Sequence, residues 1–276
     1  MIASQKPQYI KNALYLSYTS LNDFIKCPKS YYLKNIYRNP KNGFKMQIAS
    51  PYLTLGATVH DTIKWFLECE DKPVKDQVMD KFRNFWLKYS GKRGGFTSKE
   101  EEVTFGNRGL SMMEDFLKNY KALEKSVPPI SFPKYHLIDE VILIGNFDYV
   151  GERADGSLHV IDFKTGAKDE DSALQLYMYA ILAESNIQKP VSAASFWYLD
   201  REDLPREVVL DPLESTLEYL TTKAMEIKEA IEQNTWECIK EGMCRDCKAY
   251  QDLIDGKGEF MFSDFRFKKD VYYLQK

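Results

Sequence analysis

The sequence predicts an α/β fold with one core, whose sheet is flanked by helices and preceded by a helical insertion. Two observations support this fold class. Apolar residues recur at helical spacing in most of the chain up to Lys125. Short segments rich in β-branched and aromatic residues then begin, at residues 135–144 and 158–163, and helix and strand patterns alternate after them. This order favours one αβ core over two independent domains.

The individual elements are identified by their apolar stripes and by the residues that end them. The first helix begins near Ser20 and breaks at Cys27-Pro28, because proline cannot continue a helix. A hairpin or meander is expected around the turn residues 151–156, with 160–164 as its inner strand. Residues 258–276 predict one or two edge strands on the core, or else an aromatic, basic surface for a partner. The other expected elements are helices at 55–70, 76–125 with a break at 91–96, 172–184 and 214–233, and a strand at 194–198.

The composition excludes several classes of protein. The 276 residues include 38 Lys and Arg against 41 Asp and Glu, so any nucleic-acid partner must meet locally concentrated positive charge. No apolar run is long enough to span a bilayer and the N-terminus lacks the pattern of a secretory signal, so we expect a cytoplasmic protein without a membrane partner. Five cysteines are too few for a disulfide scaffold.

Two acidic residues and a lysine form the main chemical signal. Asp148 follows Gly145-Asn-Phe, and Asp162 and Lys164 lie in the segment Val-Ile-Asp-Phe-Lys-Thr-Gly. Side chains two residues apart share one face of a strand, and strand pairing can bring Asp148 beside that face. Two carboxylates and a carbonyl oxygen suit Mg²⁺ or Mn²⁺, and a lysine can orient or deprotonate an attacking water. The alternative is an exposed edge-strand ion pair, which stabilises little.

Several motifs, in the same order along the chain, resemble those of the PD-(D/E)XK nuclease superfamily, in its RecB-like branch. Residues 160–166 are similar to the family signature, and residues 18–28 are similar to its N-terminal segment. The resemblance implies a restriction-endonuclease-like core with a central mixed β-sheet, as one nuclease domain over residues 1–276 with a helical insertion at 71–130. The other matching motifs are Gly56-Ala-Thr-Val-His60, Gly145-x-x-Asp148 and Gln175-Leu-Tyr-Met-Tyr179.

The resemblance also implies roles for single residues. The metal ligands would be His60, Asp148, Asp162 and the main-chain carbonyl of Phe163. Lys164 would be the catalytic lysine, and Gln175 and Tyr179, on one helix face, would border the site and hold the DNA strand or the lysine. The implied activity is hydrolysis of DNA phosphodiester bonds, as an exonuclease or endonuclease, in repair, recombination or CRISPR spacer processing.

Some of these residues have alternative interpretations. His60 could be a buried, hydrogen-bonded helix histidine, and Gln175 and Tyr179 could simply cap the core. His159 matches no motif and alternates away from Asp162 along the strand, so we expect it to be structural.

Four cysteines form a candidate ligand set. Cys238, Cys244 and Cys247 cluster near the C-terminus, and Cys27 precedes Pro28. Four thiolates suit either zinc or an iron–sulfur cluster. Similarity to RecB-like relatives such as the AddB nuclease domain and the CRISPR adaptation nucleases implies a [4Fe-4S] cluster that connects the segment 234–276 to the N-terminal region. Zn²⁺ and free thiols are the alternatives.

The expected partner is DNA that is single-stranded or has a free end. Basic residues between Lys26 and Lys45 alternate with Tyr31, Tyr32 and Tyr37, which suits phosphate contacts and base stacking, although a solvated helix face has the same pattern. The sequence has no phosphate-binding loop of a helicase, so unwinding would need a helicase partner. A CRISPR adaptation partner is a second possibility.

Two other functional hypotheses remain. One is a non-catalytic nucleic-acid-binding module that keeps the nuclease fold, and the other is a protein of unrelated fold with chance motifs. The complete set of acidic residues, histidine and lysine argues against the first, and the shared order of the motifs argues against the second.

Overall fold

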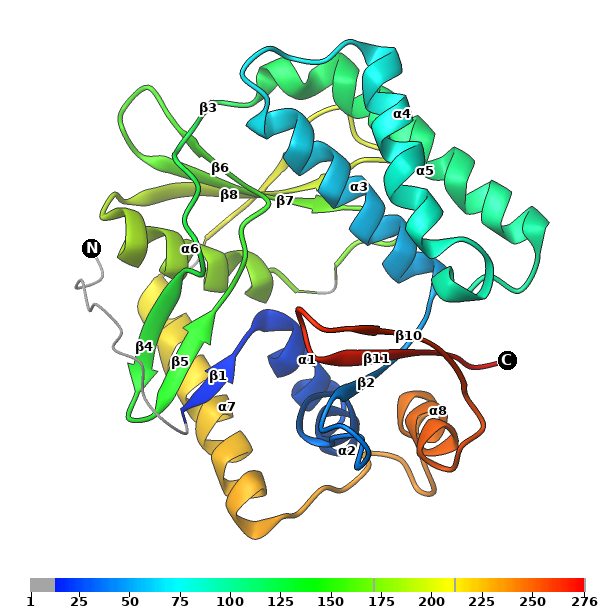
Figure 1. Ribbon diagram of the computed structural model, residues 1–276. Helices are drawn as coiled ribbons and strands as arrows, with labels where there is room; N and C mark the ends of the chain where they lie inside the picture. Colours follow the sequence, from blue (N-terminus) through cyan, green and yellow to red (C-terminus); the bar gives the residue numbers. More distant parts are fainter. Residues whose placement is uncertain (1–12, 171, 211, 276) are drawn as a thin grey trace. The chain divides into compact units, whose positions relative to one another are not determined.

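The computed structural model of the chain describes residues 13–170, 172–210 and 212–275 (Figure 1). These residues form two compact units, each built from two segments of the chain. The first unit contains the described residues up to Asn22 together with Lys118–Thr235. The second contains Asp23–Leu117 and the described residues from Trp236 onward.

The first unit is built on a five-stranded mixed sheet in the order β3-β6-β7-β8-β9. The central strand β7 pairs antiparallel with β6 and parallel with β8, and both outer pairs are antiparallel. Parallel neighbours need a long crossover connection, and helix α6 provides it. The elements are β3 (Lys125–Ser126), β6 (Tyr149–Glu152), β7 (Leu158–Lys164), α6 (Leu174–Ile187), β8 (Val191–Tyr198) and β9 (Arg206–Val208).

Helix α6 packs against one face of this sheet. Leu176 and Ala183 of the helix share one hydrophobic cluster with Val160 of β7 and with Ala194 and Phe196 of β8. The sheet therefore presents alternate residues of β7 to α6, and the residues between them face the opposite side. The last helix of the unit, α7 (Leu213–Gln233), buries Leu220, Ala224 and Ile227 at helical spacing.

A second, three-stranded sheet of the first unit differs from the sequence prediction. Residues 135–144 form two strands, β4 (Lys134–Ile138) and β5 (Val141–Ile144), joined by a turn in which Asp139 has a φ of 40°. β5 also pairs parallel with β1 (Leu14–Leu16). The predicted hairpin around residues 151–156 is confirmed, but its first strand is the short β6, whereas residues 135–144 belong to the separate β4–β5 pair. The polar pair Asp139-Glu140 was the turn signal within an otherwise apolar segment.

The second unit combines helices with a three-stranded sheet in the order β10-β11-β2. β11 pairs antiparallel with β10 and parallel with β2. The strands are β2 (Lys45–Ile48), β10 (Glu259–Asp264) and β11 (Lys269–Tyr273). The helical segments are α2 (Pro28–Tyr31), the π-helix Tyr32–Ile36, α3 (Pro51–Glu68), α4 (Lys75–Trp86), the 3₁₀ turns Leu87–Tyr89 and Gly91–Gly94, and α8 (Arg245–Ile254). Helices α1 (Tyr18–Lys26) and α5 (Lys99–Asn119) cross the boundaries between the units.

Most predicted helices are confirmed, and the breaks between them have the expected causes. α1 ends at Lys26 and α2 begins at Pro28, as the Cys27-Pro28 pair predicts. α4 and α5 are separated by a segment in which Gly95 has a φ of 82° and lies against the backbone of Ala49, so a larger residue would not fit. Helix α8 was not predicted, and β11 is the middle strand of its sheet instead of an edge.

The domain prediction itself, one domain over 1–276 with an insertion at 71–130 and a separate segment at 234–276, stays a prediction. Within the described part of the chain, no helix has the length and apolar composition needed to cross a membrane.

Candidate nuclease site

The two aspartates are brought together at the end of the β6–β7 ladder. Tyr149 of β6 pairs with Ile161 of β7, so Asp148, one residue earlier, lies next to Asp162 in the same register. The Asp148 carboxylate accepts a hydrogen bond from the main-chain N–H of Phe163 at 2.9 Å. A side chain thus serves as the acceptor where the strand ladder ends, and this fixes the carboxylate beside β7.

Lys164 is held on the same face of β7 by three side chains. Its Nζ lies 3.0 Å from Asp162 Oδ2 and 3.2 Å from Glu170 Oε1, and it donates to Gln175 Oε1 at 2.7 Å. The ammonium also lies 4.9 Å from the centre of the Phe196 ring. Burial opposes the charged form of Lys164, but the carboxylates of Asp162 and Glu170 outweigh it and raise the pKa of Lys164. An ammonium held in this way can bind or counter negative charge.

Gln175 of α6 connects the lysine to the aspartate. Its Nε2 donates to Asp162 Oδ1 at 2.7 Å and lies 3.2 Å from the Tyr179 hydroxyl, one helical turn further along. Asp162 is 3 % exposed and Gln175 is 9 % exposed, so the pair is buried in the central strand and its covering helix. The alternative of an exposed edge-strand ion pair is therefore wrong.

Tyr179 is positioned by close packing against the strand that precedes Asp148. Gly145 lies so near the helix that an added Cβ would be 2.7 Å from Leu182 and 3.1 Å from the Tyr179 ring. Phe147 meets the same ring edge-to-face, with centroids 5.8 Å apart. Burial, and then the charges of Asp162 and Asp148, raise the pKa of Tyr179. The hydroxyl of Tyr179 therefore lies in the field of both carboxylates.

The oxygen atoms gathered here fit a hard divalent cation. Two carboxylates from adjoining strand ends are ligands that Mg²⁺ and Mn²⁺ accept, and the main chain of Phe163 runs between them. His60, the third predicted side-chain ligand, lies in α3 and is half-buried. Because α3 belongs to the second unit, the role of His60 in this set stays a prediction.

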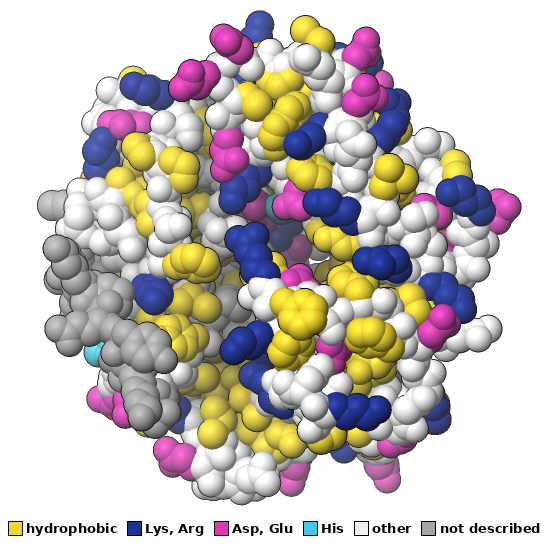
Figure 2. Space-filling view, in the orientation of Figure 1, with side chains coloured by type: hydrophobic (Ala, Val, Ile, Leu, Met, Phe, Trp, Pro, Cys, Tyr) yellow, Lys and Arg dark blue, Asp and Glu magenta, His cyan; other side chains and the backbone are white. Residues whose placement is uncertain are grey.

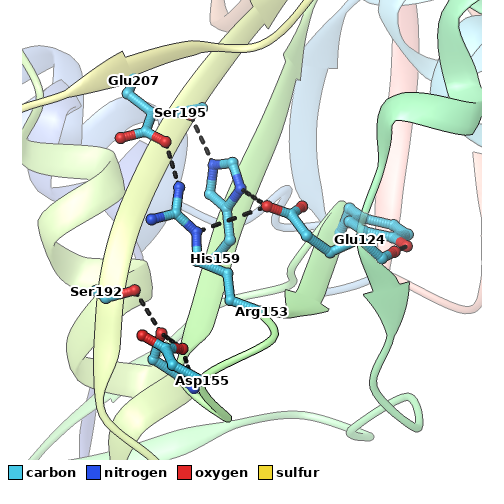
Figure 3. Close-up of polar contacts among 9 residues, drawn as sticks. Glu124, Arg153, Asp155, His159, Ser192, Ser195 and Glu207 are labelled. Atoms are coloured by element: carbon cyan, nitrogen blue, oxygen red, sulfur yellow. Dashed lines mark hydrogen bonds and ion pairs between the residues drawn. The ribbon is translucent and has the colours of Figure 1, made fainter.

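His159 lies on the other face of β7 and has structural partners there (Figure 3). One ring nitrogen is 2.8 Å from Glu124 Oε1 and the other is 2.7 Å from Ser195 Oγ of β8. Arg153 adds an ion pair with Glu124 at 3.6 Å and a second one with Glu207. Gly151 makes room for this row, because a Cβ there would lie 2.8 Å from the Glu124 side chain. The prediction that His159 faces away from Asp162 is confirmed.

The Glu124, His159 and Ser195 row has the order of a nucleophilic triad but not its access. Ser195 is fully buried and His159 is 5 % exposed. A nucleophilic serine must present its hydroxyl to a substrate carbonyl, and a serine in the middle of the sheet cannot do so. The row therefore fixes the segment before β3 against β7 and β8.

The four predicted cysteines meet within the second unit. Their sulfur atoms all lie within 4.8 Å of one another, although Cys27 is more than 200 positions from its partners. Cys27 Sγ is 3.5 Å from Cys247 Sγ and 3.7 Å from Cys238 Sγ. The main-chain N–H of Cys244 donates to Cys238 Sγ at 3.1 Å. Tetrahedral zinc at its usual Zn–S distance of about 2.3 Å requires sulfurs about 3.8 Å apart, so the geometry suits a four-thiolate centre.

The predicted single-strand surface between Lys26 and Lys45 is in part a packing surface. Tyr31 is 2 % exposed, and Tyr32 stacks on Trp236 with ring centroids 5.2 Å apart. Lys34 is paired with Asp23 at 3.0 Å and with Asp246 at 2.7 Å. Base stacking by Tyr31 is therefore excluded, because a buried ring cannot reach a base, whereas Tyr32 and Tyr37 are half-buried and their role as base-stacking groups stays a prediction.

The sequence reasoning also missed two members of the site. Glu170 stands in the acidic run 169–171 just after the strand motif, and this run was the available signal. Phe196 lies beside Asp162 in the β7–β8 register, which could be found only once the strand pair was known.

Fold and site together define a mixed α/β protein with an acidic pair and a lysine at the ends of adjoining strands. A sequence model of the PD-(D/E)XK nuclease superfamily matches residues 15–251. The chain belongs to this superfamily, and its mixed α/β architecture confirms the predicted restriction-endonuclease-like fold class. Family membership implies a nuclease, and the superfamily typically uses Mg²⁺ or Mn²⁺. A search of curated proteins found no match to the chain.

Proposed function

We propose that the protein is a deoxyribonuclease that depends on Mg²⁺ or Mn²⁺ and hydrolyses phosphodiester bonds. The observation that carries this proposal is the Asp162, Lys164 and Gln175 network, with Asp148 beside it at the end of the adjoining strand. This arrangement combines ligands for a cation with a fixed ammonium on one face of a sheet.

The residues have separate roles in the proposed reaction. A bound divalent cation would supply charge stabilisation for the phosphate and lower the pKa of a bound water. Asp148, Asp162 and the Phe163 carbonyl would hold it, with His60 as a further ligand. Lys164 would orient the attacking water and counter the charge that develops on the phosphate. Gln175 would hold the Lys164 and Asp162 side chains in position, and Tyr179 would border the DNA strand.

The experiment is digestion of end-labelled single- and double-stranded DNA with Mg²⁺, with Mn²⁺ or with a chelator. We expect the native protein to cleave in either metal, and Asp162→Ala and Lys164→Ala to lose cleavage by about 100-fold or more. Leu87→Ala, at an exposed position in the other unit, is the matched control. Equal cleavage by all variants would refute the site, and DNA binding without cleavage would favour the non-catalytic module.

The substrate and the pathway are part of the proposal and are supported by the sequence resemblance. We infer that the substrate is single-stranded DNA or DNA with a free end, cut by an exonuclease or endonuclease of the RecB-like branch. The corresponding roles are DNA repair and recombination or CRISPR spacer processing, with a helicase or a CRISPR adaptation protein as partner. Release of labelled mononucleotides, as opposed to longer fragments, separates exonuclease from endonuclease action.

We further propose that Cys27, Cys238, Cys244 and Cys247 hold a [4Fe-4S] cluster, with Zn²⁺ as the alternative. The sulfur separations fit one tetrahedral ion as they stand. A four-iron cluster requires the sulfurs to move apart, because each binds a different iron. Anaerobically purified protein is analysed for iron, sulfide and zinc. Iron, sulfide and an absorbance band at about 400 nm indicate the cluster, and zinc without them indicates the zinc site. Cys69→Ser is the matched control, since Cys69 lies outside the set. If the native protein contains neither iron nor zinc, the four thiols are free.

A further inference from the structure

The turn between β10 and β11 exposes aromatic rings that the second unit does not bury. Asp264 pairs with Lys269 at the end of the hairpin, so residues 265–268 form the turn. Phe265 is 78 % exposed and Phe267 is 57 % exposed. Turns are ordinarily built from small polar residues that lose nothing in water. Two exposed phenylalanines in one four-residue turn therefore indicate a contact surface.

The turn rests on a rigid base. Phe44 meets Phe265 edge-to-face, with ring centroids 5.8 Å apart. The buried Asp270 of β11 accepts hydrogen bonds from Asn39 and Asn42, each at 2.8 Å, and thereby ties the loop before Phe44 to the hairpin. The turn is also closed by a hydrogen bond from the Phe267 N–H to Asp264 Oδ1 at 3.2 Å. The rings are thus presented from an ordered element, which lowers the entropy lost on binding.

The surroundings of the rings are positively charged. Arg266, Lys268 and Lys269 come from the turn itself, and Lys41 and Lys45 come from the tied loop and β2. Lys45 and Lys269 are direct neighbours in the parallel β2–β11 pair. In Figure 2, hydrophobic and basic side chains lie next to one another over the area where Figure 1 shows the hairpin turn.

Two carboxylates of the hairpin itself are already engaged. Asp264 closes the turn and Asp270 is 1 % exposed and hydrogen-bonded. In the part of the chain that the structure describes, no ion pair joins Lys41, Arg266 or Lys268 to a carboxylate. Burial lowers the pKa of Lys45 most, the neighbouring cations Arg38 and Lys269 lower it further, and the Asp23 carboxylate opposes them.

We propose that this turn, with Phe265, Phe267, Arg266 and Lys268, is a binding site for single-stranded nucleic acid. Unpaired bases have free faces that stack on exposed rings, and the flanking cations contact the phosphates. A duplex hides its base faces, so it can use only the charges. The biological use of this binding site rests on the proposed function, for which it would select single-stranded substrate. Binding itself does not require cleavage.

The test measures binding in a background that cannot cut. Fluorescence anisotropy of a labelled oligothymidylate of about 20 nucleotides is recorded with the Asp162→Ala protein and a chelator, and again with a duplex. We expect Phe265→Ala with Phe267→Ala to weaken single-strand binding by about 10-fold or more, because stacking contributes about 1–3 kcal/mol per base. Duplex binding changes little. Phe132→Ala, at a residue 76 % exposed in the first unit, is the matched control and leaves both unchanged.

A second variant tests the cations. In the double variant Arg266→Ala with Lys268→Ala the rings remain. The slope of the logarithm of the single-strand binding constant against the logarithm of the salt concentration is expected to decrease in magnitude by about 0.7 per lost phosphate contact. Thermal unfolding confirms that each variant folds. Unchanged single-strand affinity in the ring variant overturns the proposal, as does an equal loss for the duplex. Loss of self-association alone would instead identify the rings as a contact between copies. If the native protein cuts no DNA yet shows the expected binding pattern, only the proposed nuclease function fails.

Discussion

The two faces of β7 carry polar groups of similar chemistry but in different surroundings. On the α6 face, Asp162 and Lys164 lie at the end of the strand, and Glu170 reaches the lysine from the following loop. On the other face, His159 lies between Glu124 and Ser195 in the interior of the sheet. The second row has the residue order of a catalytic triad but is closed to a substrate. The first row combines charge with a position at the strand end.

This difference teaches that residue order in space does not by itself identify an active site. A reacting group has to lie where a substrate atom can approach it, and strand ends and the loops that follow them provide that approach. Groups in the middle of a sheet have neighbours on all sides, so their hydrogen bonds can only hold the structure together.

The largest expected effect is on the α6 face, for Asp148→Asn. The asparagine oxygen can still accept the hydrogen bond from Phe163, so the fold should be kept, but the negative charge that would bind the cation is lost. We expect the cleavage rate to fall by about 100-fold or more, with little change in thermal unfolding. Initial rates on labelled DNA over a range of Mg²⁺ concentrations measure this effect. A rate near that of the native protein would remove Asp148 from the proposed site.

The second prediction concerns the opposite face, for His159→Ala. Removal of the ring leaves Glu124 and Ser195 without their buried partner, so the free energy of unfolding should fall by about 2–3 kcal/mol. Cleavage by the folded fraction should stay near the native rate. Urea unfolding and cleavage assays on the same sample check both statements. A stable variant that has lost cleavage would show that the His159 face takes part in the chemistry.

The sequence predicted those parts of the structure that depend on local pattern. The break at Cys27-Pro28, the helices on both sides of it and the shared face of Asp162 and Lys164 follow from proline geometry and strand alternation. The proximity of Asp148 and Asp162 could also be predicted from the pairing of the neighbouring strands, although Asp148 directly precedes β6 and does not end a strand.

Other parts depend on tertiary packing, which a local pattern does not contain. The strand β6 is only four residues long and contains Gly151, whose purpose is to admit Glu124 from a distant segment. The burial of Tyr31 depends on Phe24 and Trp236, and Trp236 lies more than 200 positions away. Glu170 contacts Lys164 only because the loop after β7 folds back, which no periodicity indicates.

The smallest expected effect, for Glu124→Gln, tests whether the His159 face is held by charge. Burial raises the pKa of Glu124, but the hydrogen bond from His159 and the positive charge of Arg153 outweigh it, so the pKa lies below its usual 4.5. A carboxyl group with a lowered pKa in the folded state stabilises the protein above its unfolded pKa, and this stabilisation is lost as the pH falls through the folded pKa.

Glu124→Gln should therefore lower the free energy of unfolding by about 1 kcal/mol at about pH 7, because the amide keeps an oxygen acceptor but not the charge. The difference from the native protein should shrink as the pH falls below about 4.5. Urea unfolding at several pH values measures it, with Glu68→Gln as the control, since Glu68 is an exposed residue at 4.0 Å from its lysine partner. A difference that persists or grows in acid would mean that hydrogen-bond geometry, and not the charge of Glu124, holds this face of β7 to the segment before β3.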